Sequence, residues 1–322
     1  GRLPKLIKSG FSGLIYTTPP TAELAELILE DAFEIMEYNH RKSGAPLLYR
    51  LEDVNEVASR MKTFNLEDTF ELGRGLLKKN KISVTFHEAG HIFGSAFVEI
   101  KAEGKKLVFS GDIGNVNVPI LNNTADLPEN VDFLLCESTY GNRLHPAGLD
   151  RKSAIEIKVR EAMNRGGSLL IPAFSIERTQ ELLYTLNELI DVEGKFKNIP
   201  IFLDSPLSIR ATRVFERYTH YYNEEAFKYL NADQNIFDFS NLTLCETRAD
   251  SKKINAVPGK KVIIAGAGMM NGGRILHHAL RYLTDIQSTL LFVGFQAPGT
   301  LGRRILMGES PVHVMGERLP VK

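Results

Sequence analysis

The chain has 322 residues, more than one hydrophobic core usually organises, so two domains are expected. Hydrophobic residues make up 43% of the sequence and charged residues 24%, a balance that argues against a mainly disordered chain. Lysine plus arginine equals aspartate plus glutamate, at 39 each. This equality excludes a coat of positive charge for nucleic acid or membranes, but it leaves room for a local basic groove.

Cysteine content, the length of apolar runs and the first residues bear on the cellular compartment, on membrane association and on where the sequence starts within its domain. Cys136 and Cys245 are too few for a disulfide framework or a zinc ribbon, and reduced thiols fit a cytoplasmic protein. No apolar run approaches the roughly 18 residues needed to cross a bilayer, so no membrane partner is expected. The sequence opens on Gly1 with neither an initiator methionine nor a signal-peptide pattern, which predicts that it starts inside a domain.

Apolar spacing predicts helices in the first part of the chain and strands after them. Residues at helical intervals, following a Pro-Pro pair, predict a helix over 21–42, and a second helix is expected over 52–61. From residue 81 onward apolar and polar residues alternate, which is typical of half-buried strands. Strands are expected over 82–86, 96–100 and 106–110, with a turn at 103–105, and the continuous apolar run 131–136 is expected to form a buried strand.

Beyond residue 141 helical and strand patterns alternate. This alternation predicts an α/β fold with a parallel sheet covered by helices on both faces. The boundary between the two domains is expected near residue 145, within an Asn-Arg-Leu-His-Pro-Ala-Gly stretch, giving domains 1–145 and 146–322. Strands are expected over 168–171, 201–203, 261–265 and 289–293, and helices over 152–164, 179–189, 207–222 and 274–283.

Residues 87–91 read His-Glu-Ala-Gly-His and match the H-E-x-x-H motif of zinc proteases. That motif works only on a helix, where histidines four residues apart share one face. Here it lies between two strand-like runs, and Gly90 would cost about 1 kcal/mol relative to alanine in a helix. A protease of this kind is therefore not favoured, and His87 is expected to be an ordinary loop histidine.

One histidine and two acidic residues stand where expected strands end. His91 follows the first strand of this region, Asp112 follows the third, and Glu137 follows the buried run. Strand ends bring side chains from distant segments to one cavity. An imidazole together with carboxylates suits a metal such as Zn²⁺. The alternative is that His91 is a buried, hydrogen-bonded histidine and that both carboxylates cap turns.

These residues lie in segments that resemble a known family. Residues 86–96 resemble the third metal-binding motif of the metallo-β-lactamase fold, and Ser110-Gly111-Asp112 resembles the fourth. Residues 135–141 resemble motif A of the β-CASP branch, in the form typical of RNA 3′-end-processing endonucleases and bacterial exonucleases. Four later segments also resemble this branch: 171–183, with Glu177 in place of the usual glycine, 204–207, 268–274 and 294–302.

The resemblance covers essentially the whole chain. It implies an α/β protein with a partial metallo-β-lactamase αββα sandwich over 1–145 and a β-CASP domain over 146–322. The implied activity is that of a zinc-dependent RNA phosphodiesterase, in which two metal ions clamp the scissile phosphate and activate water. By the same resemblance, His91 would bind one metal, Asp112 would bridge both, and Glu137 would orient a ligand or a proton-transferring histidine. RNA is the implied partner. The choice between endonuclease and exonuclease stays open. Whether the protein forms a homodimer also stays open.

Part of the family's metal site has no counterpart in the sequence. The H-x-H-x-D-H loop, which the family carries just before a segment like residues 1–6, is absent. So are the later histidines of motifs B and C, expected beyond a segment like residues 316–322, and the resemblance therefore implies truncation at both ends. With only His91 and Asp112 as ligands, the polypeptide alone is expected to bind zinc weakly and to cleave little RNA.

Two other functions remain open at this stage. One is a catalytically inactive paralogue that binds RNA or assembles with an active partner. The other is a different hydrolase of the metallo-β-lactamase fold, such as a thioesterase, although the β-CASP matches after residue 165 count against it.

Two glycine-rich turns are candidates for holding RNA phosphates. Such turns at helix N-termini present backbone N–H groups to phosphate, although most glycine-rich loops merely form tight turns. Phe174 and Phe295 have the chemistry to stack on bases, but burial is the expected role of each, and Cys136 is expected to be a buried, inert thiol. The candidate phosphate-binding residues are Gly268, Gly272, Gly273, Arg274, Gly299, Thr300 and Arg303, with Arg304 behind the second turn.

Overall fold

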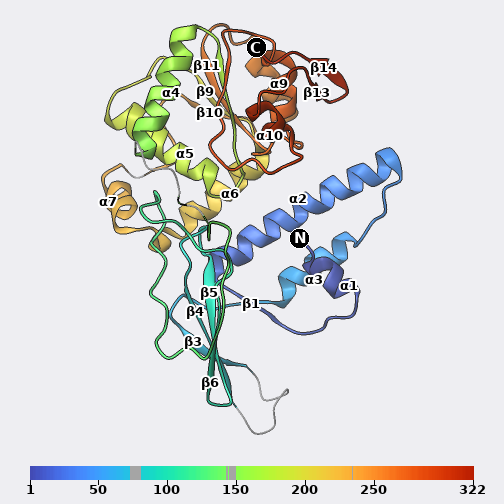
Figure 1. The fold of residues 1–322 in the computed structure, drawn as a ribbon, viewed down its shortest axis with the longest axis vertical. Helices are drawn as coiled ribbons and strands as arrows, with labels where there is room; N and C mark the ends of the chain where they lie inside the picture. The colour runs from blue at the N-terminus through green and yellow to red at the C-terminus, as the bar shows by residue number, and fades with distance from the viewer. Residues whose placement is uncertain (73–80, 143, 145–149, 234) are drawn as a thin grey trace. The chain divides into compact units, whose positions relative to one another are not determined.

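The chain folds into two compact units in the computed structural model (Figure 1). The first unit comprises residues 1–145 and 214–227, and the second comprises 146–213 and 228–322. The stretch in which a domain boundary is expected falls largely outside the described residues. The structure describes residues 1–72, 81–142, 144, 150–233 and 235–322.

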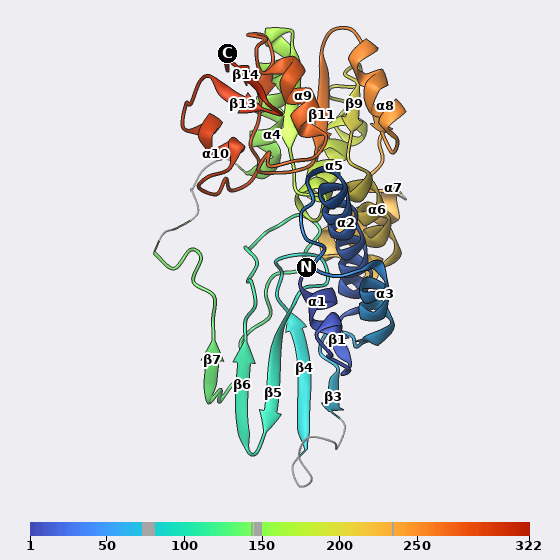
Figure 2. The ribbon, with the colours of Figure 1, turned by 90° about the vertical axis from the view of Figure 1, so that its right-hand side faces the viewer.

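The first unit is built on a five-stranded sheet whose strands keep their chain order, β3-β4-β5-β6-β7 (Figure 2). The pairs from β3 to β6 are antiparallel, and β7 pairs with β6 in parallel. Glu103 and Gly104 have left-handed φ angles of 53° and 73°, which suit the tight turn between β5 and β6. The expected strands over 82–110 are therefore confirmed. The strands are β3 (Thr69–Leu72), β4 (Ile82–Glu88), β5 (Ala96–Ala102), β6 (Lys105–Phe109) and β7 (Phe133–Leu135).

Helices and two short paired strands make up the rest of residues 1–63. Helix α2 begins with a Pro-Pro pair, whose fixed φ suits a first helical turn, and ends before Gly44, which has a left-handed φ of 69°. Leu29 of this helix shares a buried cluster with Val54 and Val57 of α3. Both expected helices are confirmed. The elements are α1 (Leu3–Lys8), β1 (Ile15–Thr17), α2 (Pro19–Ser43), α3 (Leu51–Arg60) and β2 (Met61–Thr63), with β1 and β2 parallel.

Strand β7 forms as expected, but the expectation that it is buried is wrong. Phe133, Leu134 and Leu135 are each about half exposed. The strand is the last of the sheet, so one edge is unpaired among the described residues, and alternate side chains on both faces stay accessible. Cys136 directly after it is exposed as well, which corrects its assignment as a buried thiol.

The second unit is a parallel sheet of order β10-β9-β11-β8-β12, flanked by α4 and α5 on one side and α9 on the other (Figure 1). Strands β8, β9 and β11 are buried along their whole length, which is why their sequences are continuous apolar runs. The expected α/β fold with a covered parallel sheet is confirmed. The strands are β8 (Ser168–Pro172), β9 (Ile201–Leu203), β10 (Leu242–Leu244), β11 (Lys261–Ala265) and β12 (Thr289–Leu290).

The helices and strands expected after residue 150 all form, with two clear differences in length. Helix α6 stops at Arg217 and a separate 3₁₀ turn follows at Thr219–Tyr221, while strand β12 is shorter than expected. Several further elements were not anticipated: strand β10, the helices over 224–233, 248–253 and 301–306, and a hairpin of β13 (Val312–Val314) and β14 (Glu317–Leu319). The helices are α4 (Arg151–Arg165), α5 (Arg178–Asn187), α6 (Pro206–Arg217), α7 (Glu224–Asp233), α8 (Arg248–Lys253), α9 (Ile275–Tyr282) and α10 (Leu301–Leu306). Within the described ranges, every helix is too short or too polar to cross a membrane.

Candidate functional site

Three strands of the first unit end at the same edge of their sheet. Strands β4 and β6 both run antiparallel to β5, so they share one direction, and β7 runs parallel to β6. Their carboxyl ends therefore lie along one edge, and His91, Asp112 and Glu137 come shortly after these ends. The topology thus brings together the three residues that were expected to converge.

Close contact between two loops sets the distance from His91 to Asp112. The backbone N–H of Gly114 donates to the carbonyl oxygen of Ala89 at 2.8 Å. A Cβ atom at Gly114 would lie 1.8 Å from the carbonyl oxygen of Gly90, so only glycine permits this approach. As a result, Nε2 of His91 lies 3.9 Å from Oδ2 of Asp112, and the side chains are 41% and 73% exposed. The expected alternative of a buried His91 is therefore wrong.

Glu137 fixes the backbone around this pair. Its Oε1 accepts a hydrogen bond from the N–H of Ile113 at 2.8 Å, and its Oε2 accepts one from the N–H of Thr139 at 3.1 Å. The side chain of Thr139, the Ile113 N–H and the nearby charge of His91 all lower the pKa of Glu137. The residue is thus an ionised carboxylate that ties the segment after β7 to the loop carrying Asp112.

His91 and Asp112 make only part of a metal-binding shell. A structural or catalytic zinc ion takes at least three protein ligands. Among the residues that the structure describes, no group of three or more His, Cys, Asp or Glu side chains is placed to hold a metal ion. The residues present therefore do not fit a closed metal centre, and the assignment of His91 and Asp112 as ligands stays a prediction.

His87 lies in β4, opposite Phe97 of β5, so its assignment to a loop is wrong. Its Nδ1 is 2.8 Å from Oε2 of Glu67, and its Nε2 is 3.1 Å from Oε2 of Glu99. Because β4 extends through Glu88, the H-E-x-x-H pattern spans a strand and a loop rather than a helix. The rejection of a zinc-protease motif is confirmed.

Glu88, the last residue of β4, carries a perturbed carboxyl that the sequence did not indicate. Burial raises its pKa to about 7, the N–H of Gly90 opposes this by donating to Oε1 at 2.8 Å, and the charge of Glu67 adds to the increase. Composition and spacing contain no signal for such a shift, because it depends on how the loop folds back over the strand.

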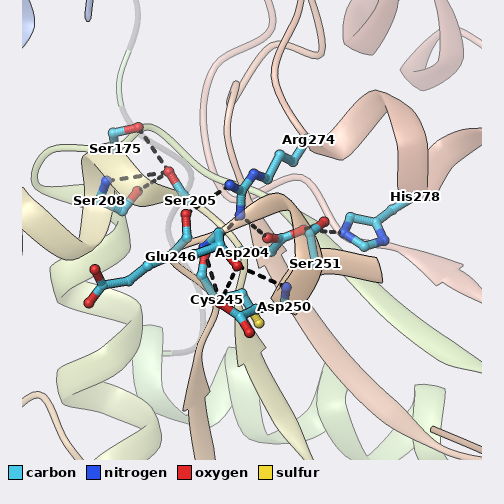
Figure 3. Close-up of polar contacts among 11 residues, drawn as sticks. Ser175, Asp204, Ser205, Ser208, Cys245, Glu246, Asp250, Ser251, Arg274 and His278 are labelled. Carbon is cyan, nitrogen blue, oxygen red and sulfur yellow. Dashed lines mark hydrogen bonds and ion pairs between the residues drawn. The ribbon is translucent and has the colours of Figure 1, made fainter. Parts of the chain in front are cut away.

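The second unit places a closed polar network at the carboxyl edge of its sheet (Figure 3). Asp204 follows β9 and is fully buried. Its Oδ1 accepts from Arg274 at 2.6 Å, and its Oδ2 accepts from the Ser251 hydroxyl at 2.6 Å and lies 2.7 Å from Nε2 of His278. Burial alone would raise the pKa of Asp204, but the hydrogen bonds from His278, Ser251 and Arg274 outweigh it, so the pKa is lowered.

Arg274, a candidate phosphate ligand, is occupied within the protein. Besides Asp204, its guanidinium donates to the carbonyl oxygens of Cys245 at 2.8 Å and Glu246 at 2.9 Å (Figure 3). It therefore connects the ends of β9 and β10 to the start of α9. This position gives Arg274 a structural role, and its contact with phosphate stays a prediction.

The other candidate phosphate residues lie in two ordered turns. In the first, the N–H of Ala267 donates to Gly272 and the N–H of Ile275 donates to Gly266, which folds the segment over the end of β11. In the second, the hydroxyl of Thr300 accepts from the N–H of Arg303 at 3.1 Å and so caps α10. Phosphate binding by Gly268, Gly272, Gly273, Gly299, Thr300 and Arg303 stays a prediction.

Two aromatic side chains of the second unit are more accessible than expected. Phe174 is 41% exposed and Phe295 is 51% exposed, so the expectation that both are buried is wrong. Phe174 follows β8, and its ring packs on backbone atoms of glycines rather than inside the apolar core.

Comparison with known proteins identifies a matching family model and several relatives of this chain. The model of the Beta-Casp domain matches residues 179–305. The chain is 36% identical to ribonuclease TTHA0252 of Thermus thermophilus, over 100% of this chain and 70% of that protein. It is 31% identical to transcription termination factor FttA of Methanosarcina mazei, over 98% of this chain and 49% of that protein. It is 26% identical to endoribonuclease YSH1 of Yarrowia lipolytica, over 93% and 35%. The chain thus spans only part of the length of each of these relatives.

Proposed function

Because the chain belongs to the β-CASP ribonucleases of the metallo-β-lactamase fold, we propose that it acts on RNA as a zinc-dependent phosphodiesterase. In this proposal residues 1–145 form the metallo-β-lactamase-fold domain and residues 146–322 form the β-CASP domain. The observation that carries the proposal is the meeting of His91, Asp112 and Glu137 at one edge of a sheet. The names of two relatives, a ribonuclease and an endoribonuclease, support RNA as the substrate.

His91 and Asp112 are the proposed metal ligands, since zinc takes imidazole nitrogen and carboxylate oxygen in proteins. Glu137 is a positioning residue, because its carboxylate holds the N–H groups of Ile113 and Thr139. Removing this carboxylate would loosen the loop that carries Asp112.

The polypeptide alone is proposed to bind zinc weakly and to cleave little RNA. Two protein ligands leave a zinc ion short of the three or four that proteins use to retain it. A second candidate function, RNA binding without cleavage, is favoured by the same observation, since the described residues hold no group of three ligands. RNA binding is common to both candidates, and cleavage separates them.

Zinc content and RNA cleavage, measured together, test the proposal. Mass spectrometry of the dialysed chain should find well under one zinc ion per chain, and labelled RNA should be cut slowly, faster with added zinc. Asp112→Ala should abolish the zinc-dependent part, whereas Asp126→Ala, an exposed aspartate of the same unit, should not. The lengths of the labelled products report whether cuts fall within the RNA or at an end. RNA that is bound but never cut, at any zinc concentration, supports the binding function instead.

A further inference from the structure

Phe174 sits on a backbone surface that glycines make possible. A Cβ atom at Gly268 would lie 3.0 Å from Cδ2 of the Phe174 ring and 2.9 Å from its backbone nitrogen. A Cβ atom at Gly294 would lie 3.6 Å from Cε2 of the same ring. The ring therefore rests on two glycine backbones, and a side chain at Gly268 would displace it. This arrangement leaves 41% of the residue open to solvent.

The surface beneath the ring is held by buried hydrogen bonds. The side chain of Gln296 is only 2% exposed, and its Nε2 donates to the carbonyl oxygens of Gly268 at 3.0 Å and Gly294 at 3.1 Å. One amide group thus ties together the two glycines that touch Phe174. The hydroxyl of Thr179 donates to the carbonyl oxygen of Phe174 at 2.7 Å and fixes the backbone of the phenylalanine itself. An exposed ring on such a support has little freedom to fold away.

Phe174 and several polar groups lie at the edge where a parallel sheet usually binds ligands. The carboxyl ends of β8, β9 and β11 meet here, the edge at which open α/β sheets hold their ligands. The hydroxyls of Ser175 and Ser205 lie 3.4 Å apart at these ends (Figure 3). Phe295 is 51% exposed and follows Gly294 directly in the sequence. The loop that carries Gly294 therefore presents a second aromatic side chain. One aromatic face among hydroxyl and backbone groups suits a nucleobase better than an apolar protein surface.

We propose that Phe174 is a stacking platform for a base of single-stranded RNA. This inference rests on the proposed function, because it names how the RNA is held rather than what is done to it. Stacking needs no particular base, so the platform grips RNA without reading its sequence. It also adds no charge contact, so it contributes to affinity but not to the salt dependence of binding.

Binding of labelled oligouridylate to the full chain tests the platform. Phe174→Ala should weaken binding roughly 5- to 150-fold, the range expected for loss of one base–aromatic stack. Phe174→Leu should weaken it similarly, because leucine keeps apolar bulk without an aromatic face, whereas Phe174→Tyr should bind like the wild type. The slope of log affinity against log salt should be the same in all four proteins.

A direct optical readout is available because the chain contains no tryptophan. Phe174→Trp introduces a single fluorophore at the platform, and RNA should quench its emission on binding. Phe227→Trp is the matched control, because Phe227 is 44% exposed but lies on α7, outside the loops that form the proposed platform, and its emission should not respond.

Two outcomes would overturn the inference, and they differ in what else they overturn. If RNA binds but Phe174→Ala is as tight as the wild type, or Phe174→Trp is not quenched, the platform is refuted and the proposed function stands. If the wild-type chain binds no RNA at all, the platform and the proposed action on RNA fail together.

Discussion

Two aspartates, one in each unit, follow sheet strands and differ in nearly every contact. Asp204 is fully buried, and its carboxylate meets Arg274, Ser251 and His278 within 2.7 Å. Asp112 is 73% exposed, and the histidine paired with it is 3.9 Å away. A closed network of satisfied groups leaves no capacity for an outside ligand, whereas an open pair keeps that capacity. The difference indicates that Asp204 supports the architecture of its unit, and it is consistent with the proposal that Asp112 binds a metal ion.

The largest effect is expected where the closed network is broken. Asp204→Ala would leave the partly buried Arg274 and the buried His278 without their carboxylate, which typically costs about 3–5 kcal/mol of unfolding free energy. Urea denaturation measures this loss. Asp238→Ala, at an exposed aspartate of the same unit, is the control and should change stability little. A loss below about 1 kcal/mol at Asp204 would contradict a structural role for the network.

Glu88 gives the next largest effect, and it depends on pH. Its pKa is raised from 4.5 to about 7 in the folded protein, so between these values the folded state holds a proton that the unfolded state has released. The free energy of unfolding should therefore fall as pH rises from about 4.5 to about 7 and level off above. Glu88→Gln cannot ionise, and it should be more stable than the wild type by up to about 3 kcal/mol near pH 8 and by almost nothing near pH 4.

Urea denaturation at several pH values checks this expectation for Glu88. Glu34→Gln, at an exposed position of α2, removes the same charge and should leave the pH profile unchanged. A constant difference between Glu88→Gln and the wild type at every pH would contradict the raised pKa.

Strands with a clear apolar pattern could be predicted from the sequence, but the burial of their side chains could not. Alternation over 82–110 indicates three strands correctly because one side chain in two faces the core. The run ending at Cys136 also forms a strand, yet Phe133, Leu134 and Leu135 are exposed. An apolar run reports the tendency to form a strand, whereas burial depends on what else packs against it, which local sequence does not contain.

The two sites were predictable to different degrees for a related reason. The meeting of His91 and Asp112 follows from strand direction, so the position of each after a strand was enough to expect it. The partners of Asp204 lie 47 to 74 residues further along the chain, and only the strand order β10-β9-β11 brings them together. Spacing along the sequence does not reveal that order. For this reason Arg274 was expected to contact phosphate, whereas in the structure it donates to Asp204.

Arg303 and Arg304, at the second glycine-rich turn, test phosphate contact in the second unit. The expected effect is smaller than the two above. Arg304 is held by Glu309, with contacts of 2.8 and 2.5 Å, so its charge is already compensated. Arg303 is the proposed phosphate contact, and Arg303→Ala should lower the slope of log RNA affinity against log salt by about one. Arg304→Ala should leave this slope nearly unchanged. Equal slopes for Arg303→Ala and the wild type would remove Arg303 from the RNA surface.

The smallest effect on stability is expected at Asp112, and it completes the contrast with Asp204. Asp112→Ala should change the free energy of unfolding by less than about 0.5 kcal/mol, because an exposed pair at 3.9 Å contributes little to folding. The same variant should lose the zinc-dependent part of RNA cleavage. Urea denaturation and the cleavage assay on one protein sample measure both quantities. If Asp112→Ala were strongly destabilising, the His91–Asp112 pair would be needed for folding. Its exposure to solvent would then no longer support a ligand site.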